Sequence, residues 1–319
     1  MIRVEKAGPL TTVQDAGRPG YRAAGVPLGG AMDRRALAEA NLLCGNAPDA
    51  AALEMTVAGG VLRFERDGHA ALAGADLEAR LDGEPRPAGA SFAVHRGAVL
   101  SFGVARAGVR GYLAVRGGID VPPVLGSRST LLVAGLGGFA GRALRAGDLV
   151  PVGVAPGPDP AARSLLPSER TDPGAPVTLR CLLGPQDDAF TDEGLRTLFD
   201  STYRASVHSD RMGCRLDGPA PGLRGAADIV TDAVLPGAVQ VTGSGAPIVL
   251  GADCQTTGGY AKIATVIWPD LARLSQVRPG EAVRFVRCEH AEAVRAVADE
   301  RSALSALARR LGVEVAGWR

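Results

Sequence analysis

Hydrophobic and polar residues alternate in short runs along most of this chain. After Ala51 the apolar positions recur every second residue, in runs that include Ala70–Leu72 and Leu77–Leu81, and Asp82-Gly83 is a hairpin turn signal. New runs begin at intervals of about 8–12 residues, which is typical of an antiparallel barrel or sandwich and not of alternating strands and helices. The pattern therefore predicts a mainly β protein with a few helices.

Helical spacing replaces the alternation at a few places. Leu37, Ala40 and Leu43 are spaced for one face of a helix, with Asp33 as a good N-cap before them and Gly45 at the expected end. An amphipathic helix is predicted near the C-terminus, and two shorter helices are predicted in the second half. The C-terminal helix spans Glu289–Leu311, and the two shorter ones span Asp192–Phe199 and Asp270–Leu274. The apolar residues near one face of the C-terminal helix are Val294, Val297, Leu304, Leu307 and Leu311.

The chain divides into two halves that resemble each other weakly. Pro151–Pro176 is rich in Pro, Ala, Gly and Ser and has little periodicity, so it is predicted to connect the halves. Arg145–Val150 (RAGDLV) resembles Arg278–Val283 (RPGEAV), and each segment ends a half. The echo indicates two like barrels, and we expect domains over residues 1–160 and 161–319, the second carrying the C-terminal helix.

Composition excludes several classes of protein. The formal net charge is +1, which gives no bulk field for nucleic acid or membranes, and 43 Gly and 22 Pro fit many tight turns. The N-terminus lacks the apolar stretch of a signal peptide, and no apolar run reaches a membrane-spanning length. The five cysteines form no CxxC pair and the four histidines no HxxxH pair. We therefore expect a cytoplasmic protein with reduced thiols and no zinc site of its own.

Two polar, glycine-rich stretches are candidates for shaped loops. Gln14–Asp33 has almost no periodicity, yet it carries Asp15 and Arg18 among its glycines. A structureless stretch of about 20 residues is usually functional or disordered, and the mixture of charge and glycine favours a shaped loop. In the second stretch, Arg116–Leu132, the segment Ser127–Thr130 is suited to bind an anion, although a cap and turn is an equally open interpretation.

Lysine is almost absent from the chain, which draws attention to the few positions where it occurs. Lys262 and Lys6 are the only two lysines, and the other 33 of the 35 Lys and Arg residues are arginine. An ammonium fits a tight oxygen cage that a planar guanidinium does not. Small donors precede Lys262, and a glycine-rich backbone there lets N–H groups approach a carbonyl, carboxylate or phosphate. The alternative is a glycine-rich turn with a solvated lysine. The preceding residues are Gln255, Thr256, Thr257, Gly258 and Gly259.

Five acids lie next to glycines or in loops, where catalytic carboxylates are usually placed. No pair has a diagnostic spacing, so general acid–base roles stay open, and for Asp33 an N-cap role alone is the alternative. Cys254 has no obvious histidine partner in the sequence and is a weak nucleophile candidate. The glycine patterns of the familiar nucleotide-binding loops are absent. The five acids are Asp15, Asp33, Glu54, Asp210 and Asp253.

Five motifs taken together carry a family resemblance that covers roughly residues 2–288. They are TTVQDAGRPGYRAAGVPLGGAMD, YLAVRGGIDVPPVLGSRST, LLGPQDDAF, SDRMGCRLDGP and GADCQTTGGYAKIATVIWPDLARLSQVRPGEAVRF, in this order. The set resembles the KipA/PxpC family, whose members are also described as biotin-dependent carboxyltransferase-like or allophanate-hydrolase-subunit-2-like. Two departures, Ala261 before the lysine and Cys254 before the glutamine, leave the motif's Gln255 and Lys262 in place.

The resemblance implies a fold, an activity and partners. The fold is a pair of tandem cyclophilin-like β-barrels. The activity is that of the C subunit of an ATP-dependent 5-oxoprolinase, which hydrolyses 5-oxo-L-proline to L-glutamate with a KipI/PxpB-like and a PxpA-like subunit and uses ATP with Mg²⁺ in the complex. One alternative is a carboxyltransferase subunit that moves CO₂ from carboxybiotin to urea or a similar amide. Another is a non-enzymatic regulator that binds a KipI-like kinase inhibitor.

Loop composition and the resemblance together suggest site residues, with no metal ligands among them. Lys262 is expected to neutralise a carboxylate or a developing oxyanion, in a cleft that it shares with the Gln14–Asp33 loop. The expected catalytic residues are Lys262, Gln255, Asp15 and Asp253. The expected substrate-binding residues are Arg18, Gly29, Gly30, Asp33, Glu54, Asp210, Arg211, Gln240, Thr256, Thr257, Gly258 and Gly259.

Overall fold

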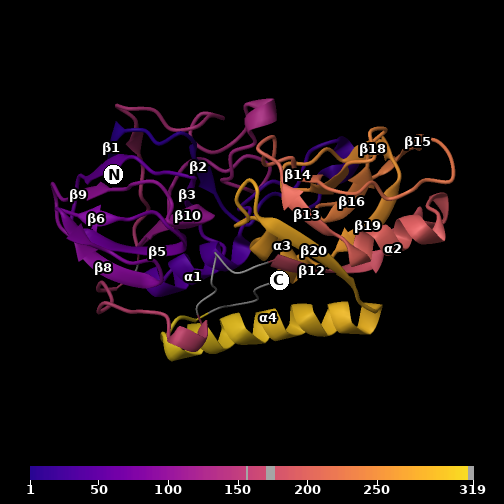
Figure 1. Cartoon of the computed structure of the whole chain (residues 1–319). Coiled ribbons are helices and arrows are strands. Elements are labelled where there is room, and N and C mark those ends of the chain that lie inside the picture. Colours follow the sequence, from indigo (N-terminus) through magenta and orange to yellow (C-terminus); the bar gives the residue numbers. More distant parts are fainter. Residues whose placement is uncertain (156, 170–176, 315–319) are drawn as a thin grey trace. The chain divides into compact units, whose positions relative to one another are not determined.

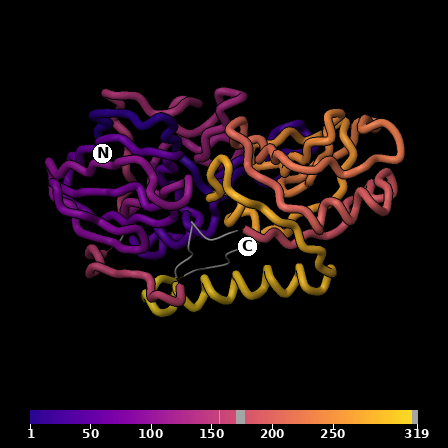
Figure 2. The backbone as a smooth tube through the Cα atoms, in the orientation of Figure 1, coloured from indigo at the N-terminus to yellow at the C-terminus, as the bar shows by residue number. Residues whose placement is uncertain are grey.

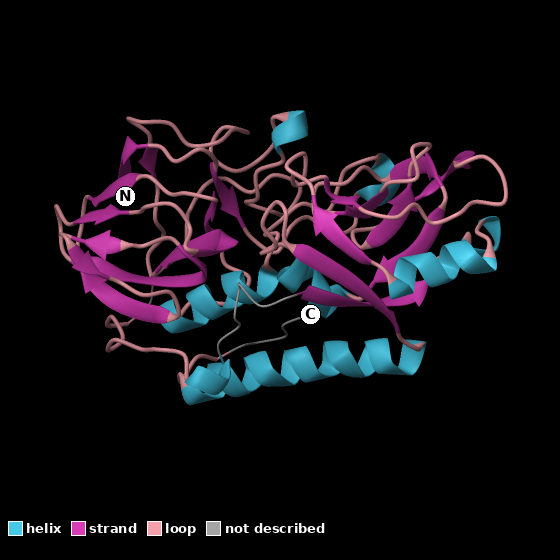
Figure 3. Cartoon of the chain, in the orientation of Figure 1, coloured by secondary structure: helices cyan, strands magenta, loops and turns pink. Residues whose placement is uncertain are grey.

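The computed structural model describes residues 1–155, 157–169 and 177–314 (Figure 1). The chain forms two compact units. Unit 1 comprises residues 1–18, 29–174 and 301–319, and unit 2 comprises residues 19–28 and 175–300. The division at residues 160 and 161 stays a prediction, and residues 156 and 170–176 of the predicted connection lie outside the described part. Strands make up most of the regular structure in both units, as Figure 3 shows, which confirms the mainly β prediction.

Unit 1 contains two antiparallel sheets with a hydrophobic core between them. The core takes its side chains from alternate positions of both sheets, for example Ile2 and Phe64 from one and Leu53 and Leu113 from the other. One sheet has the strand order β11 (Leu149–Val150), β1 (Ile2–Lys6), β4 (Val61–Phe64), β9 (Val99–Ser101), β6 (Arg80–Leu81) and β7 (Glu84–Pro85). The other has the order β2 (Thr11–Gln14), β3 (Ala52–Thr56), β10 (Ala107–Val115), β5 (Gly68–Asp76) and β8 (Ala90–Val94).

Helix α1 (Arg34–Cys44) packs on the opposite face of the five-stranded sheet. Asp33 is its N-cap, because the Asp33 carboxylate accepts a hydrogen bond of 2.9 Å from the backbone N–H of Ala36. Gly45 ends the helix with a φ of 76°, a left-handed conformation that favours glycine. The predicted start and end of this helix are confirmed.

The predicted strand over Leu77–Leu81 is wrong in its first part. β5 ends at Asp76, Glu78 has a positive φ of 49°, and only Arg80–Leu81 is extended. The apolar run continues through the bend because Leu77 and Ala79 still point into the core. The hairpin turn at Asp82-Gly83 is confirmed, since it joins β6 to β7 with Leu81 opposite Glu84.

Unit 2 is built around a closed barrel of seven strands. Segments far apart in the sequence meet in it, because its first strand pairs in parallel with its last (Figure 2). The strands, in order round the barrel, are β12 (Val177–Leu183), β19 (Lys262–Val266), β16 (Ala238–Val241), β17 (Pro247–Leu250), β14 (Gly213–Asp217), β13 (Thr202–Ala205) and β20 (Ala282–Arg287). In unit 1 the strands form two separate sheets, so tandem barrels of one kind remain a prediction.

Shorter elements complete both units. A separate two-stranded sheet in unit 2 pairs β15 (Asp228–Ala233) with β18 (Thr257–Tyr260). The helices α2 (Asp192–Asp200) and α3 (Trp268–Leu274) fall close to their predicted ranges. The single-turn helices are η1 (Arg22–Ala24), η2 (Leu132–Ala134), η3 (Pro167–Glu169) and η4 (Asp187–Ala189).

The predicted C-terminal helix is confirmed as α4 (His290–Arg310), but its apolar face is partly wrong. Val294 is 54% exposed, whereas Ala293 and Ala296 are buried against Cys288. Alanines therefore form the buried face of the first half of α4. The prediction used only large apolar residues and so did not find this face. In the second half Leu304, Leu307 and Leu311 pack with α1, as the spacing predicted. No described helix is both long and apolar enough to cross a membrane.

Candidate functional site

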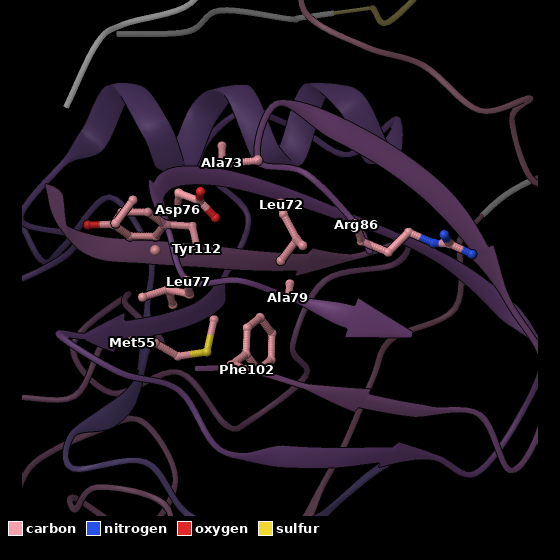
Figure 4. A pocket seen from close by; sticks show the side chains of 12 residues that line it. Met55, Leu72, Ala73, Asp76, Leu77, Ala79, Arg86, Phe102 and Tyr112 are labelled. Carbon is pink, nitrogen blue, oxygen red and sulfur yellow. The ribbon is translucent and has the colours of Figure 1, made fainter. Parts of the chain in front are cut away.

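Two hollows in unit 1 contain none of the predicted site residues. The first lies among Met55, Leu77, Phe102 and Tyr112 (Figure 4), with a volume of about 10 Å³, which is room for about one water molecule. The second, of about 200 Å³, lies beside the N-terminus and is lined in part by Arg66. The candidate site is therefore built from the predicted residues themselves, one unit at a time.

Lys262 is buried in unit 2 and paired. It is the first residue of β19, and only 3% of it is exposed. Its ammonium donates to Asp232 Oδ2 at 2.6 Å and to the carbonyl oxygen of Ala233 at 3.0 Å. A buried ammonium is stable only when a charge and hydrogen bonds compensate for its lost hydration. The alternative of a solvated lysine is therefore wrong.

Gln186 connects both ends of this ion pair. Its side-chain oxygen accepts a hydrogen bond of 3.2 Å from the backbone N–H of Lys262, and its amide nitrogen donates to Asp232 Oδ2 at 3.3 Å. The Lys262 pair holds the pKa of the Asp232 carboxyl below its usual range. We call Lys262, Asp232, Ala233 and Gln186 the Lys262 cluster.

Glycine in β18 brings two predicted glutamines together beside this cluster. Gln240 lies opposite Lys262 in the barrel and donates to the carbonyl oxygen of Tyr260 at 3.3 Å. A Cβ on Gly258 would lie 2.7 Å from the Gln240 side-chain nitrogen and 3.5 Å from that of Gln255. Any larger residue at position 258 would displace Gln240.

The other predicted residues of this loop surround the same strand. Thr257 and Gly259 belong to β18, and Thr256 accepts a backbone hydrogen bond of 3.1 Å from Val234. Gln255 and Thr257 are exposed, whereas Gln240 is buried. Gln240 and Gln255 thus both approach Gly258, and Gln240 also lies opposite Lys262.

Asp253 and Arg211 form a buried ion pair. The Nε and Nη2 atoms of Arg211 donate to the two carboxylate oxygens of Asp253 at 2.7 and 2.9 Å, and the two side chains are 6% and 2% exposed. This two-point contact fixes the loop before Gln255. The catalytic role of Asp253 stays a prediction. Asp210 is exposed and accepts from the backbone N–H groups of Met212 and Gly213, which is a turn contact.

Cys254 is a poor nucleophile. Burial raises the pKa of its thiol to about 11, although the neighbouring Arg22 acts in the opposite direction. At neutral pH the side chain is therefore almost entirely a thiol. Arg22 itself donates to the carbonyl oxygen of Val234, so the segment of residues 19–28 is anchored in unit 2.

In unit 1, the carboxylate of Asp15 is bound by the second glycine-rich loop. Asp15 Oδ1 accepts from the Ser127 hydroxyl at 2.7 Å and from the backbone N–H of Gly17 at 2.8 Å, and Oδ2 accepts from the backbone N–H of Arg128 at 2.5 Å. The anion that the Ser127–Thr130 segment binds in this structure is the chain's own Asp15.

Arg18 extends this arrangement. Its side chain is fully buried, and its guanidinium donates to the carbonyl oxygen of Ser129. The hydroxyl of Ser129 lies 2.8 Å from that of Ser127. We call Asp15, Arg18, Ser127, Arg128 and Ser129 the Asp15 cluster.

Glycine is required at position 30, where the backbone passes close to the backbone of Gly17. A Cβ on Gly30 would lie 2.7 Å from the backbone nitrogen of Gly17, and Gly30 has a φ of 85°. The preceding Gly29 also has a positive φ, of 62°. Both predicted glycines therefore shape the backbone around Asp15.

Glu54 and Asp33 meet at one tyrosine. The Tyr112 hydroxyl donates to Glu54 Oε2 at 2.6 Å and accepts from the backbone N–H of Asp33 at 2.8 Å, and Met32 N–H also donates to Glu54. Burial, and then the charges of Glu54 and Asp33, raise the pKa of Tyr112 well above its usual value. Tyr112 therefore stays a neutral donor, and it holds Glu54 in place on β3 of the five-stranded sheet.

Sequence reasoning missed Asp232, Gln186 and Tyr112. Gln186 and Tyr112 lie inside quoted family motifs, which was a usable signal, whereas nothing around Asp232 marked it. The shared cleft predicted for Lys262 and Asp15 joins residues of different units and stays a prediction. The described residues hold no group of three or more His, Cys, Asp or Glu side chains placed to bind a metal ion.

Comparison with known proteins adds to this geometry. Residues 24–287 match the family model described as carboxyltransferase domain, subdomain A and B. The chain is 41% identical over 314 residues to the C subunit of 5-oxoprolinase from Escherichia coli, covering 98% of this chain and 99% of that protein. It is 38% identical over 287 residues to the C subunit of 5-oxoprolinase from Haemophilus influenzae, covering 89% and 90%.

A solved structure shares the fold. The crystal structure of the Kluyveromyces lactis urea amidolyase matches with a TM-score of 0.90 and 29% identity. The match covers 96% of this chain and 20% of that much longer protein.

Proposed function

Because this chain belongs to the carboxyltransferase subdomain A and B family and to the family of 5-oxoprolinase C subunits, we propose that it hydrolyses 5-oxo-L-proline to L-glutamate as part of a complex of three different subunits. The observation that carries the proposal is 41% identity over nearly the full length of both chains. The other subunits are a KipI/PxpB-like and a PxpA-like protein, and catalysis needs all three.

The chemistry of the Lys262 cluster fits this reaction. A ring amide is hydrolysed only when its carbonyl oxygen is polarised, and preorganised donors in a water-poor site do this well. The Lys262 ammonium is buried and held by two acceptors, so it needs little reorganisation to donate to that oxygen. Gln255 and Thr256 would hydrogen-bond the rest of the amide, while Gly258 allows the close approach.

The nucleotide belongs to the complex in this proposal. In the complex, ATP with Mg²⁺ would supply the phosphoryl group that activates the amide oxygen and would leave as ADP. Two expectations accompany the proposal: tandem cyclophilin-like barrels, which the family resemblance implies, and a cytoplasmic location, which the composition suggests.

The test is ATP-dependent glutamate release by the three purified subunits. Lys262→Met keeps the length of the side chain and removes the ammonium, so we expect kcat to fall by about 10²–10³-fold, the usual effect of losing one preorganised donor to the reacting oxygen. Lys6→Met is the matched control, because Lys6 is the other lysine and lies exposed on β1 of unit 1. Full activity of Lys262→Met would overturn the role of Lys262.

A second candidate is a carboxyltransferase that moves CO₂ from carboxybiotin to urea or a similar amide. The fold shared with the urea amidolyase, at a TM-score of 0.90, favours it. This reaction needs biotin on another chain. Avidin abolishes it and leaves 5-oxoprolinase activity intact, which separates the two reactions in one assay. A regulator of a KipI-like kinase inhibitor, the third possibility, would bind its partner without any ATP turnover that depends on 5-oxoproline.

A further inference from the structure

The acceptor of Lys262 lies on a strand that does not belong to the barrel. Within the described part of the chain, β15 pairs with β18 alone, in a two-stranded sheet that we call the β15–β18 ribbon. Most of β15 is exposed, and Val230 on it is 92% exposed. Asp232 is 49% exposed, whereas Lys262 is 3% exposed. The ion pair therefore joins a buried barrel residue to a partly solvated carboxylate.

The ion pair of Lys262 and Asp232 has no net charge, but the Lys262 ammonium keeps one N–H group free to donate to a ligand. An ammonium has three N–H groups, and Asp232 and Ala233 accept from two of them. Among the residues that the structure describes, no acceptor is present for the third. Gln186 holds both partners in place by bonding the Asp232 carboxylate and the Lys262 backbone. A ligand at Lys262 thus meets one oriented N–H beside a fixed negative charge.

This arrangement separates neutral ligands from anions. A carbonyl oxygen can accept a hydrogen bond from the third N–H at little electrostatic cost, because it carries no net charge. A carboxylate that does the same is repelled by the neighbouring Asp232 oxygens, because like charges within a few ångströms disfavour each other. Sequence reasoning left open whether Lys262 receives a carboxylate or an amide oxygen.

We infer that Asp232 is a specificity-determining residue, which makes Lys262 a site for the uncharged oxygen of an amide and excludes carboxylates from it. The substrate class rests on the function proposed above, and under it the carboxylate of 5-oxo-L-proline is held by other groups. The same pair would serve urea, which is also a neutral amide. Asp232 acts through Lys262 and does not itself touch the substrate.

The scarcity of lysine makes the inference testable without the enzymatic reaction. An amine-acetylating reagent on the full chain modifies only Lys6, Lys262 and the N-terminus, and mass spectrometry separates these positions. We compare protection of Lys262 by 2-pyrrolidinone, a neutral ring amide, with protection by cyclopentanecarboxylate, a ring of the same size with a carboxylate. Lys6 is the internal reference because it is exposed.

In the wild type, 2-pyrrolidinone slows acetylation of Lys262 and the carboxylate does not. In Asp232→Asn the preference shifts toward the carboxylate by roughly fivefold, which corresponds to about 1 kcal/mol. Asp232→Glu keeps the wild-type preference, and so does Asp228→Asn, which removes an exposed charge from the same strand. The inference is overturned by carboxylate protection of the wild type, by no protection from the amide, or by an unchanged preference in Asp232→Asn.

The outcome is distinguishable from failure of the proposed function. If Lys262→Met abolishes glutamate release but Asp232→Asn does not change the preference, the proposed function stands and the inference fails. If the preference shifts as expected but the complete complex releases no glutamate, amide recognition at Lys262 stands and the 5-oxoprolinase proposal fails.

Discussion

The two units hold their charged side chains in different ways. In unit 1 the predicted acids accept hydrogen bonds from the backbone and from hydroxyl groups, as Asp15 does from Arg128 N–H and Ser127, and Asp33 from Ala36 N–H. In unit 2 three acids belong to ion pairs that have at least one buried partner, whereas Asp210 accepts from backbone N–H groups. The pairs are Asp253 with Arg211, Asp270 with Arg180, and Asp232 with Lys262.

The difference decides what a substitution leaves behind. An acid removed from unit 1 leaves N–H or O–H groups without an acceptor, which costs about 1–3 kcal/mol. A partner removed from a buried pair in unit 2 leaves an uncompensated charge, which costs about 3–5 kcal/mol. Of these three pairs with a buried partner, the Lys262 pair has the most exposed acid, at 49%, so it can meet a ligand with the least rearrangement.

The largest effect is expected at the buried pair of unit 2. Arg211→Met fills similar space but leaves the Asp253 carboxylate buried and unpaired. We expect the free energy of unfolding to fall by about 3–5 kcal/mol, measured by urea denaturation. Arg211→Met combined with Asp253→Leu should recover part of the loss, because neither charge is left. The control is Arg224→Met, whose pair with Asp192 is exposed and should contribute less than about 1 kcal/mol. Equal losses for both single variants would contradict the comparison.

Glu39 on α1 is a buried acid of unit 1 that pairs with a base. It is 3% exposed and bonded to Arg35 at 2.9 Å, and burial raises its pKa from 4.5 to about 7, with Arg35 acting against the shift. Because the folded chain binds this proton more tightly, stability is greatest below about pH 4.5 and falls as the pH rises to about 7. The loss amounts to roughly 3 kcal/mol.

Glu39→Gln should remove this pH dependence. We expect the melting temperatures of variant and wild type to diverge between pH 4.5 and 7, with the variant more stable at the upper end, and to run parallel above it. Thermal unfolding at a series of pH values measures this. Glu5→Gln, an exposed acid of the same unit, is the control. Parallel curves across the whole range would show that Glu39 is not held in this way.

How much of this was predictable depends on whether a feature is local. Alternation predicted a mainly β protein, and Asp33 and Gly45 marked both ends of α1, because caps and strands depend on near neighbours in the chain. The position of Gly258 beside Gln240 was not predicted, because Gln240 lies outside the family motifs.

Partners could not be predicted where they come from distant segments. Asp232 is 30 residues from Lys262, and Ser127 is 112 residues from Asp15. Nothing in the local sequence distinguishes Asp232 from Asp228 on the same strand. Asp15 and Asp253 have similar sequence surroundings, since each lies close to a glycine. Their partners differ, because Asp15 binds hydroxyl and N–H groups and Asp253 binds a guanidinium. Sequence reasoning therefore placed the candidate residues but could not separate those that bind substrate from those that hold the backbone.

A smaller effect is expected at Asp15. Asp15→Ala removes the acceptor of Ser127, Gly17 and Arg128, and we expect a loss of about 1–3 kcal/mol in the free energy of unfolding. Ser127→Ala removes one of these contacts and should cost less. If Asp15 also takes part in catalysis, kcat of the complex falls much further for Asp15→Ala than for Ser127→Ala when both are assayed well below their melting temperatures. Equal falls in kcat would assign Asp15 to the backbone alone.

The smallest effect separates the two roles left open for Asp33. Asp33→Ala removes the N-cap of α1 and should cost about 1 kcal/mol, while Asp33→Ser keeps an acceptor for Ala36 N–H and should cost only a few tenths. Thr191→Ala, which removes the N-cap of α2, is the matched control in unit 2. A cap that only orders the helix predicts that Asp33→Ser retains both stability and the KM of the complex. If Asp33→Ser retains stability but raises KM, the charge of Asp33 acts on the substrate. In that event unit 1 also contributes a charged group to substrate binding, and the two units differ only in how many such groups they supply.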